Sequence, residues 1–327
     1  MSTQATPSAT KAKSPEELKS GGFIPERRKG TITVRCKAPG GLLNAQRLRK
    51  IAEVAERYGS GEVHLSVRMS PEILHVPMED LPALVEDLAQ AGQEIASCGK
   101  RVRVPTACGG CHWNPNGLTE TQRLAQETCD RFFGQDTPHK FKISFSGCPI
   151  DCMRTREMDL GFQGEIELNY NSDTCVGCGL CVRACEDDAL ELVDDKIRVY
   201  RDRCIGCGAC VRVCPTDSMT AARTGHVVNI GGKHGKHPHT AYPIAHMVPE
   251  EQIPAVIEAA IAWYREHGQR GERIGDTLDR VGIDSLRRAL KPVVGSALLQ
   301  QKDLEQPRWR RIYHAGVANA FPPYAEV

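Results

Sequence analysis

Eight cysteines fall into two quartets that share one spacing, Cys-x2-Cys-x2-Cys-x3-Cys. Cysteines with this spacing bind [4Fe–4S] clusters in many proteins. Where two such quartets occur together, the fourth thiolate of each quartet binds the cluster of the other quartet. One cluster is therefore assigned to Cys175, Cys178, Cys181 and Cys214, and a second to Cys204, Cys207, Cys210 and Cys185. Glycines in the same loops are expected to relieve backbone crowding around the metal: Gly177, Gly179, Gly206 and Gly208. Structural zinc is the alternative, because Cys-x2-Cys pairs also bind zinc.

A second, looser set of cysteines precedes these quartets. Cys108 and Cys111 stand at Cys-x2-Cys, and Cys148 and Cys152 at Cys-x3-Cys. Four thiolates could serve a third Fe–S cluster or a structural zinc, or Cys108 and Cys111 could form a redox dithiol. The three single cysteines are expected to be small buried hydrophobes: Cys36, Cys98 and Cys129.

Composition limits the classes of protein that fit. The chain has 327 residues and 15 cysteines, and its net charge of +1 gives no general reason to expect nucleic acid or an anionic membrane as a partner. No stretch approaches the roughly 20 apolar residues of a spanning helix. We expect a soluble cytoplasmic protein, where disulfides are rare and many cysteines indicate metal. Neither a P-loop nor a dinucleotide fingerprint is present.

The elements that must position these cysteines begin after a polar tail, which is predicted to be disordered over residues 1–22. Alternating apolar residues predict strands, and Asn44 is a candidate cap for a helix that stops at Gly59 with Leu48, Ile51, Ala52 and Ala55 on one face. The order is β-α-β-β-α-β, which is ferredoxin-like in topology. The predicted elements are strands Thr31–Lys37, Glu62–Val67, Glu72–Val76 and Arg101–Val104, and helices over residues 44–58 and 80–91.

The second half of the chain carries further strands and helices. A strand over Lys140–Ser146 runs into Gly147-Cys148-Pro149-Ile150-Asp151-Cys152. After the quartets, a strand is predicted over Val227–Ile230, and helices over Ile253–His267 and Asp276–Leu290. The tail from Gln306 is rich in arginine and aromatic residues, and Pro322-Pro323 predict extended chain there.

Four segments of the sequence resemble the siroheme sulfite and nitrite reductases: VRCKAPGGLL, HKFKISFSGCPIDC, DLGFQG and VVNIGGKHG. The resemblance extends from about Thr31 to Leu290, with the quartets inserted between the last two segments. This layout is most similar to the catalytic subunit of anaerobic sulfite reductases and to the dissimilatory sulfite reductase subunits. It implies an α+β protein with four parts: a tail (1–22), a ferredoxin-like half-domain (23–95), a siroheme and [4Fe–4S] domain (96–170 and 219–327), and an inserted bacterial-type 2[4Fe–4S] ferredoxin domain (171–218).

The resemblance also implies a use for the second cysteine set. Cys108, Cys111, Cys148 and Cys152 would hold a third [4Fe–4S] cluster, and the Cys152 thiolate would bridge it to the siroheme iron. The family usually has Cys-x5-Cys in the first pair, which would place the second cysteine at Asn114 rather than Cys111. An arginine that the family carries just after this pair is replaced here by Pro115.

Cationic residues complete the implied site. Arg35, Lys140 and Lys142 match the family's substrate-binding cations, and two lysines two residues apart on a strand share one face. Arg68 and Arg103, together with the loop residues Gly231, Gly232, Lys233, His234 and Lys236, match siroheme contacts, although Met69 replaces a usual glutamine. The tract that contains His234, His237, His239 and His246 could instead bind metal or lie on the surface.

The function that the resemblance implies is six-electron reduction of sulfite to sulfide, with electrons entering through the two ferredoxin-type clusters. Siroheme nitrite reduction is one alternative, and a non-catalytic electron-transfer subunit is another. Because the chain carries one copy of a half-domain that assimilatory enzymes repeat twice, we expect a dimer with itself or a related chain. A separate donor protein or ferredoxin should supply the electrons.

Overall fold

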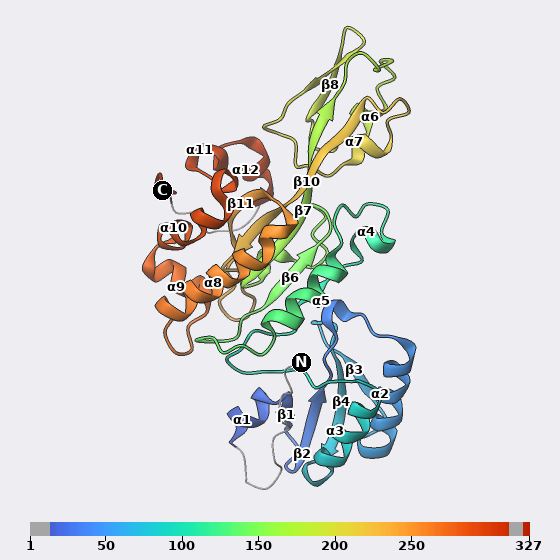
Figure 1. The fold of residues 1–327 in the computed structure, drawn as a ribbon, viewed down its shortest axis with the longest axis vertical. Helices are drawn as coiled ribbons and strands as arrows, with labels where there is room; N and C mark the ends of the chain where they lie inside the picture. Colours follow the sequence, from blue (N-terminus) through green and yellow to red (C-terminus); the bar gives the residue numbers. More distant parts are fainter. Residues whose placement is uncertain (1–13, 314–322) are drawn as a thin grey trace.

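The computed structural model describes residues 14–313 and 323–327 (Figure 1). The N-terminal part is a four-stranded antiparallel sheet in the order β1-β2-β4-β3, packed against two helices. Its elements are β1 (Phe23–Pro25), β2 (Thr31–Arg35), α2 (Ala45–Tyr58), β3 (Val63–Leu65), β4 (Pro71–Pro77) and α3 (Leu81–Gln90). From β2 to α3 its elements follow the order of the first five elements of the predicted ferredoxin-like topology.

The helix α2 begins where the sequence predicts, because the Asn44 side chain accepts the Arg47 backbone N–H at 2.8 Å. Its buried face differs from the prediction. Ile51, Val54 and Ala55 are buried, at the i, i+3, i+4 spacing of one helical stripe, and Ala52 is exposed. Leu48, in the first turn, is 52% exposed.

Two predictions for this part of the chain are wrong. Arg101–Val104 does not complete the first sheet, because Arg101 and Val102 bridge to Asp136 and Phe141 of the second part. The edge position beside β2 is filled by β1 instead, which pairs with β2 as a hairpin. The predicted disordered tail ends earlier than residue 22, since α1 (Pro15–Ser20) is closed by a capping box between Ser14 and Glu17; residues 1–13 lie outside the described residues.

The second part is built on a five-stranded sheet in the order β11-β10-β7-β6-β5. β5, β6 and β7 run parallel, and β10 and β11 are antiparallel to their neighbours. The helix predicted over Asp276–Leu290 is broken into two at Gly282, whose φ of 93° no continuous helix can include. The elements are β5 (Thr106–Ala107), α4 (Gly110–Trp113), α5 (Thr121–Phe132), β6 (Ile143–Ser146), β7 (Leu160–Tyr170), β10 (Met219–Ile230), β11 (Tyr242–Val248), α8 (Ile253–His267), α9 (Ile274–Val281) and α10 (Ile283–Val294).

β7 and β10 extend beyond this sheet as a two-stranded stalk that carries residues 171–218 at its far end (Figure 1). This module contains α6 (Leu180–Arg183), β8 (Leu190–Val193), β9 (Lys196–Val199) and α7 (Ala209–Arg212). Leu168 of β7 and Met219 of β10 belong to the module's own core, so the stalk is continuous with it.

The C-terminal segment is helical before Pro322-Pro323, where extended chain is predicted, and residues 323–327 form neither helix nor strand. It forms α11 (Gln301–Leu304) and α12 (Pro307–Tyr313), which lies beside the base of the module (Figure 1). Pro322 lies outside the described residues. Among the residues that the structure describes, no helix combines the length and the apolar character needed to cross a membrane.

Candidate functional site

The eight module cysteines line two cavities. One, of about 310 Å³, is lined by Cys175, Cys178, Cys181 and Cys214, and the other, of about 360 Å³, by Cys185, Cys204, Cys207 and Cys210. We call these the outer and the inner cysteine site. Each combines three thiols of one quartet with the fourth thiol of the other, the same grouping as in the ligand sets predicted from the spacing.

Glycines shape the loops of both sites. Gly206 has a φ of 71°, and a Cβ at this position would lie 2.6 Å from the Ile166 carbonyl oxygen of β7. The Ile166 N–H in turn donates to the Gly206 carbonyl at 3.0 Å. The loop of the inner site is therefore seated directly on β7, and only glycine allows this approach.

Three thiols of the inner site, Cys204, Cys207 and Cys210, are hard to ionise without a metal, because burial raises the pKa of each. Burial raises the pKa of Cys210 to about 12, and its neighbours Cys204 and Cys207 add to the rise. Burial also raises the pKa of Cys204, although the Arg308 charge acts against it. Such thiols become thiolates when iron supplies the compensating positive charge.

Two cysteines of the second set follow the parallel strands, and Cys152 lies four residues beyond the second of them. Cys108 follows β5 and Cys148 follows β6. The Cys108 sulfur accepts the N–H groups of Gly147 at 3.1 Å and Gly110 at 3.4 Å. Burial raises the pKa of Cys148, and the charges of Cys108 and Cys152 raise it further, which places these three thiols in one electrostatic environment. We call them the sheet-end cysteines.

Cys111 differs from the other three. It lies on α4 with its side chain exposed. Burial raises its pKa, followed by the charges of Glu120 and Glu250 rather than those of other cysteines. Its part in a quartet therefore stays a prediction.

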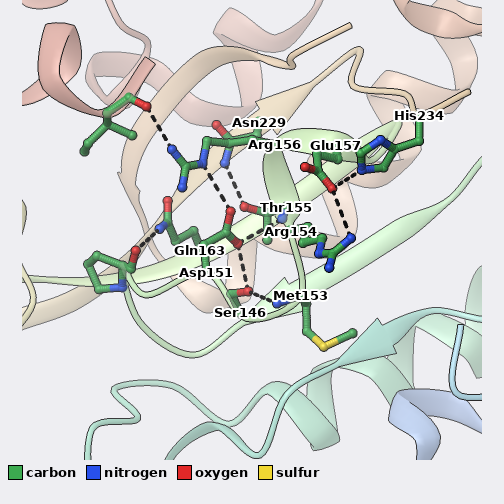
Figure 2. A network of polar contacts seen from close by, with 12 residues as sticks. Ser146, Asp151, Met153, Arg154, Thr155, Arg156, Glu157, Gln163, Asn229 and His234 are labelled. Atoms are coloured by element: carbon green, nitrogen blue, oxygen red, sulfur yellow. Dashed lines mark hydrogen bonds and ion pairs between the residues drawn. The ribbon is translucent and has the colours of Figure 1, made fainter. Parts of the chain in front are cut away.

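The loop that carries Cys148 and Cys152 is held by Asp151 (Figure 2). Asp151 is buried and has a φ of 56°. Its carboxylate accepts the Ser146 hydroxyl and the Thr155 N–H, both at 2.9 Å, and the Arg156 Nε at 3.2 Å. A buried carboxylate with these partners fixes the turn between the two cysteines.

Cations gather at the other end of the same strands, around one carboxylate. The cations Arg103 and Lys142 precede β5 and β6, and the carboxylate of Asp159 precedes β7. β6 begins at Ile143, so the two lysines lie just before the strand rather than on it, flanking the buried Phe141. Arg68 joins them from the β3–β4 loop, where it donates to the Val104 carbonyl.

This group, which we call the cation cluster, holds more positive charge than its carboxylates neutralise. Asp159 is fully buried but is already bound by both arms of Arg273, at 2.8 and 2.7 Å. Burial, followed by Arg68 and Arg273, lowers the pKa of Lys142 to about 8. Burial and the Arg103 charge lower the pKa of Arg68 to about 9. Burial, followed by Arg273 and Arg103, also lowers the pKa of Lys140.

Two buried donors of the cation cluster have no acceptor among the described residues, Arg68 Nη1 and Arg103 Nε. Arg103 is only 9% exposed, and its Nη2 donates to the Gly99 carbonyl at 2.9 Å. Unsatisfied buried donors that carry positive charge fit an anionic ligand.

Arg35, the third predicted substrate cation, is partly occupied. Its Nε lies 2.6 Å and its Nη2 2.5 Å from Glu72 Oε1, and its Nη1 donates to the Cys98 sulfur at 2.9 Å. Cys98 is buried as expected but also serves as an acceptor, so the interpretation as plain hydrophobic filler is incomplete. Cys36 and Cys129 are buried without such a contact in the described hydrogen bonds.

The predicted glycine and histidine loop follows β10. The Gly231 N–H donates to the Asp159 carbonyl at 2.9 Å, so the loop begins beside the cation cluster. A Cβ at Gly232 would lie 2.4 Å from the Arg156 carbonyl. Lys233 pairs with Asp276, His234 pairs with Glu157 (Figure 2), and Lys236 is exposed. Within the described part of the chain, no three Cys, His, Asp or Glu side chains lie close enough to bind a single metal ion.

The two groups of residues lie at opposite ends of one set of strands. On β5 and β6, the cations come before the strand and the cysteines after it. Lys142 and Cys148 are six residues apart, about 20 Å in extended chain. A single chain therefore presents the cation cluster and the sheet-end cysteines on separated surfaces.

Several residues that organise the site were not among the predicted ones: Glu72, Asp151, Arg156, Asp159, Arg273 and Arg308. The role of Asp151 could have been predicted from the sequence, because it stands between the candidate ligands Cys148 and Cys152. Asp159 directly precedes a strand, but its partner Arg273 is 114 positions away, and no local pattern connects them.

Comparison with known proteins agrees with this geometry. The family profile of the nitrite and sulphite reductase 4Fe-4S domain matches residues 98–297, and that of the nitrite/sulfite reductase ferredoxin-like half domain matches residues 24–91. The chain is 32% identical to a coenzyme F420-dependent sulfite reductase of Methanocaldococcus jannaschii over 84% of its length, and 29% identical to an anaerobic sulfite reductase subunit of Salmonella typhimurium over 50%.

The chain spans 44% and 52% of the length of these two relatives. The fold matches the crystal structure of dissimilatory sulfite reductase I with a TM-score of 0.66 at 20% identity, over 81% of this chain and 71% of that one. The family profile covers more than half of the chain, and both profiles agree with the two sheets described above. The chain therefore belongs to the nitrite and sulphite reductase family of siroheme and [4Fe–4S] oxidoreductases.

Proposed function

We propose that this protein reduces sulfite to sulfide. The observation that carries the proposal is the cation cluster, where Arg68, Arg103, Lys140 and Lys142 surround a single carboxylate that Arg273 already neutralises. An excess of buried positive charge is suited to a small oxyanion and a polyanionic cofactor. The sulfite reductases among its relatives support the choice of anion.

Siroheme fits the residues that are present. Its carboxylates would be bound by the unsatisfied donors of Arg68 and Arg103 and by the Gly231–Gly232 loop, where any side chain would clash. Cys152 would be among the thiolates that hold the cluster working with it. When bound, these groups supply the electrons for a reaction that consumes six electrons and seven protons per sulfite and yields the hydrogen sulfide ion and three waters.

The chain's own side chains would bind the anion and deliver protons. The Lys142 ammonium, whose pKa of about 8 lies close to neutral, can hold a proton at Nζ and release it toward a leaving oxygen. Lys140, whose pKa is lowered mainly by burial, can do the same. Arg35, fixed by Glu72 and Cys98, would hold the anion without exchanging a proton.

We propose that the three cysteine sites act in a line, from the outer site to the inner site to the sheet-end cysteines. Two contacts support the position of the inner site beside the sheet. Gly206 rests on Ile166 of β7, and a Cβ on Gly208 would lie 3.2 Å from Leu118, whose N–H donates to the Gly147 carbonyl. The Arg212 charge also acts on Cys148. The outer site is then where an external one-electron donor would bind.

We further propose a dimer of this chain in which each cation cluster faces the partner's sheet-end cysteines. Apolar side chains are exposed beside both groups. Val67 is 93% exposed in the loop that carries Arg68, and Ile150 is 64% exposed between Cys148 and Cys152. Both side chains would be covered if the two regions met across the interface of such a dimer.

The experiment that tests this function starts from protein purified without oxygen. Iron, acid-labile sulfide and siroheme are counted per chain, and turnover is then compared on sulfite and on nitrite with one reduced dye as donor. The proposal expects three clusters, one siroheme and faster turnover of sulfite. Faster turnover of nitrite would favour the nitrite reductase alternative, and clusters without siroheme would favour an electron-transfer subunit.

A further inference from the structure

The C-terminal helix α12 contacts both the module and the loop that follows β6. The Arg308 N–H donates to the Asp202 carbonyl at 3.0 Å, two residues before Cys204 of the inner site. The Arg311 guanidinium lies 3.3 Å from Asp187, two residues after Cys185. At the other end of the helix, the Ile312 carbonyl accepts the Arg156 Nη1 at 2.9 Å.

Arg156 is also bound to Asp151, the carboxylate that fixes the turn between Cys148 and Cys152. The seven-residue helix α12 therefore contacts the loops of the inner site directly. It contacts the loop of the sheet-end cysteines indirectly, through Arg156. This helix lies beyond residue 297, where the match to the family profile ends.

At the centre of this contact is a buried ion pair. The Arg308 Nη2 donates to Glu165 Oε2 at 2.6 Å, and the two side chains are 11% and 1% exposed. Glu165 also accepts the Met247 N–H at 2.7 Å, and the Arg308 guanidinium lies 4.5 Å from the centre of the Trp309 ring. Residues of β7, β11 and α12 therefore all take part in these contacts.

The pair adjoins the inner cysteine site. Glu165 precedes Ile166, on which the Gly206 loop rests, and a Cβ at Gly206 would lie 3.1 Å from the Glu165 Cβ. Two histidines also feel the Glu165 charge: His246, whose Nδ1 is 3.9 Å away, and the buried His226; burial keeps the pKa of each below its ordinary value. At neutral pH the pair therefore contributes one positive and one negative charge that nearly cancel.

We propose that the Arg308–Glu165 pair sets the reduction potential of the cluster in the inner cysteine site, with Arg308 as a positioning and charge-balancing residue rather than a catalytic one. The inference rests on the proposed function, because it requires a cluster at that site. A cluster gains one negative charge when it accepts an electron from the donor. A nearby positive charge stabilises the reduced form and a nearby negative charge destabilises it, more strongly in a buried site than in water.

The two ends of the pair therefore give effects of opposite sign. Arg308→Met keeps the length of the side chain, removes the positive charge and leaves Glu165 unpaired, so it lowers the potential. Glu165→Gln keeps the shape, leaves Arg308 unpaired, and raises the potential. The double variant has a neutral pair and returns toward the wild-type value. Arg310→Gln on the exposed side of the same helix is the matched control and leaves the potential unchanged.

The test is a redox titration of each full-length variant, followed by electron paramagnetic resonance, with iron counted in every sample. Shifts of opposite sign in the single variants, cancelling in the double variant, are the expected result. Shifts of the same sign, or none, at wild-type iron content would overturn the inference. If Arg308→Met loses iron, the inference is tested by the other two variants: the potential should rise in Glu165→Gln and return toward the wild-type value in the double variant. Wild-type protein without a cluster at the inner site would instead count against the proposed function.

Discussion

The separation of the cation cluster from the sheet-end cysteines makes a prediction about mixed dimers. In the proposed dimer, one site takes its thiols from one chain and its cations from the other. A chain with Lys142→Met and a chain with Cys152→Ser should each be inactive alone. When the two are expressed together, a heterodimer has one site with both defects and one site with neither.

The expected magnitude follows from counting sites. Random pairing of equal amounts makes about half of the dimers heterodimers, and one of their two sites is intact. Activity should therefore recover to about a quarter of the wild-type level. Within one chain, Lys142 and Cys148 lie at opposite ends of β6, about 20 Å apart in extended chain, which favours a site shared between chains. If each site were instead built from a single chain, every site of the heterodimer would carry one defect and no activity would return.

The assay is dye-linked sulfite reduction by heterodimers isolated with two different affinity tags, in which half of the wild-type activity is expected because every dimer then has one intact site. Homodimers of each variant and a mixture of separately purified homodimers are the controls. Activity that stays at the level of the homodimers, in heterodimers with wild-type iron and siroheme, would refute the composite site.

Three further predictions concern single residues. The KM for sulfite should rise above pH 8 in the wild type, because Lys142, with a pKa of about 8, loses the positive charge that attracts the anion as the pH passes that value; a Lys142→Arg variant, whose guanidinium keeps its charge over the same pH range, should lack this rise. Asp151→Ala should lose iron from the sheet-end cysteines and lower the Tm, because alanine in the left-handed region costs about 1–2 kcal/mol and the buried hydrogen bonds are lost as well. Asp151→Asn should keep most of that iron, and equal iron loss in both variants would count against the role of the turn. Gly206→Ala should lose iron from the inner site because its Cβ meets the Ile166 carbonyl, whereas Gly61→Ala, with a φ of 79° and open space around it, should show the backbone strain alone.

Sequence reasoning worked where the signal was local. The strand around Ile32 and Val34, the Asn44 cap and the helix Ile253–His267 were readable from spacing that spans a few residues. It failed where two segments compete for one place. The apolar alternation over Arg101–Val104 is typical of a strand, but β1 occupies the edge of the first sheet instead. Nothing in the sequence indicates which of these two segments pairs with β2.

The candidate site shows the same limit. The module cysteines carry their grouping in their spacing, so the sequence alone predicts which four line each cavity. The grouping of the cation cluster cannot be predicted from spacing in this way, because its members come from the β3–β4 loop and from the starts of β5 and β6, and its partner Arg273 lies before α9. Its charge balance depends on one contact between Asp159 and Arg273, which only the fold brings together.

The distribution of charge explains why the site should be completed by a second chain. Because β5 and β6 hold the two groups apart, Arg68 and Arg103 keep buried donors with no acceptor in the described part of the chain. Each such donor costs about 1–3 kcal/mol while it stays unsatisfied. A polyanionic cofactor between two chains would satisfy them and cover Val67 and Ile150 at the same time, so cofactor binding and dimer formation should strengthen each other.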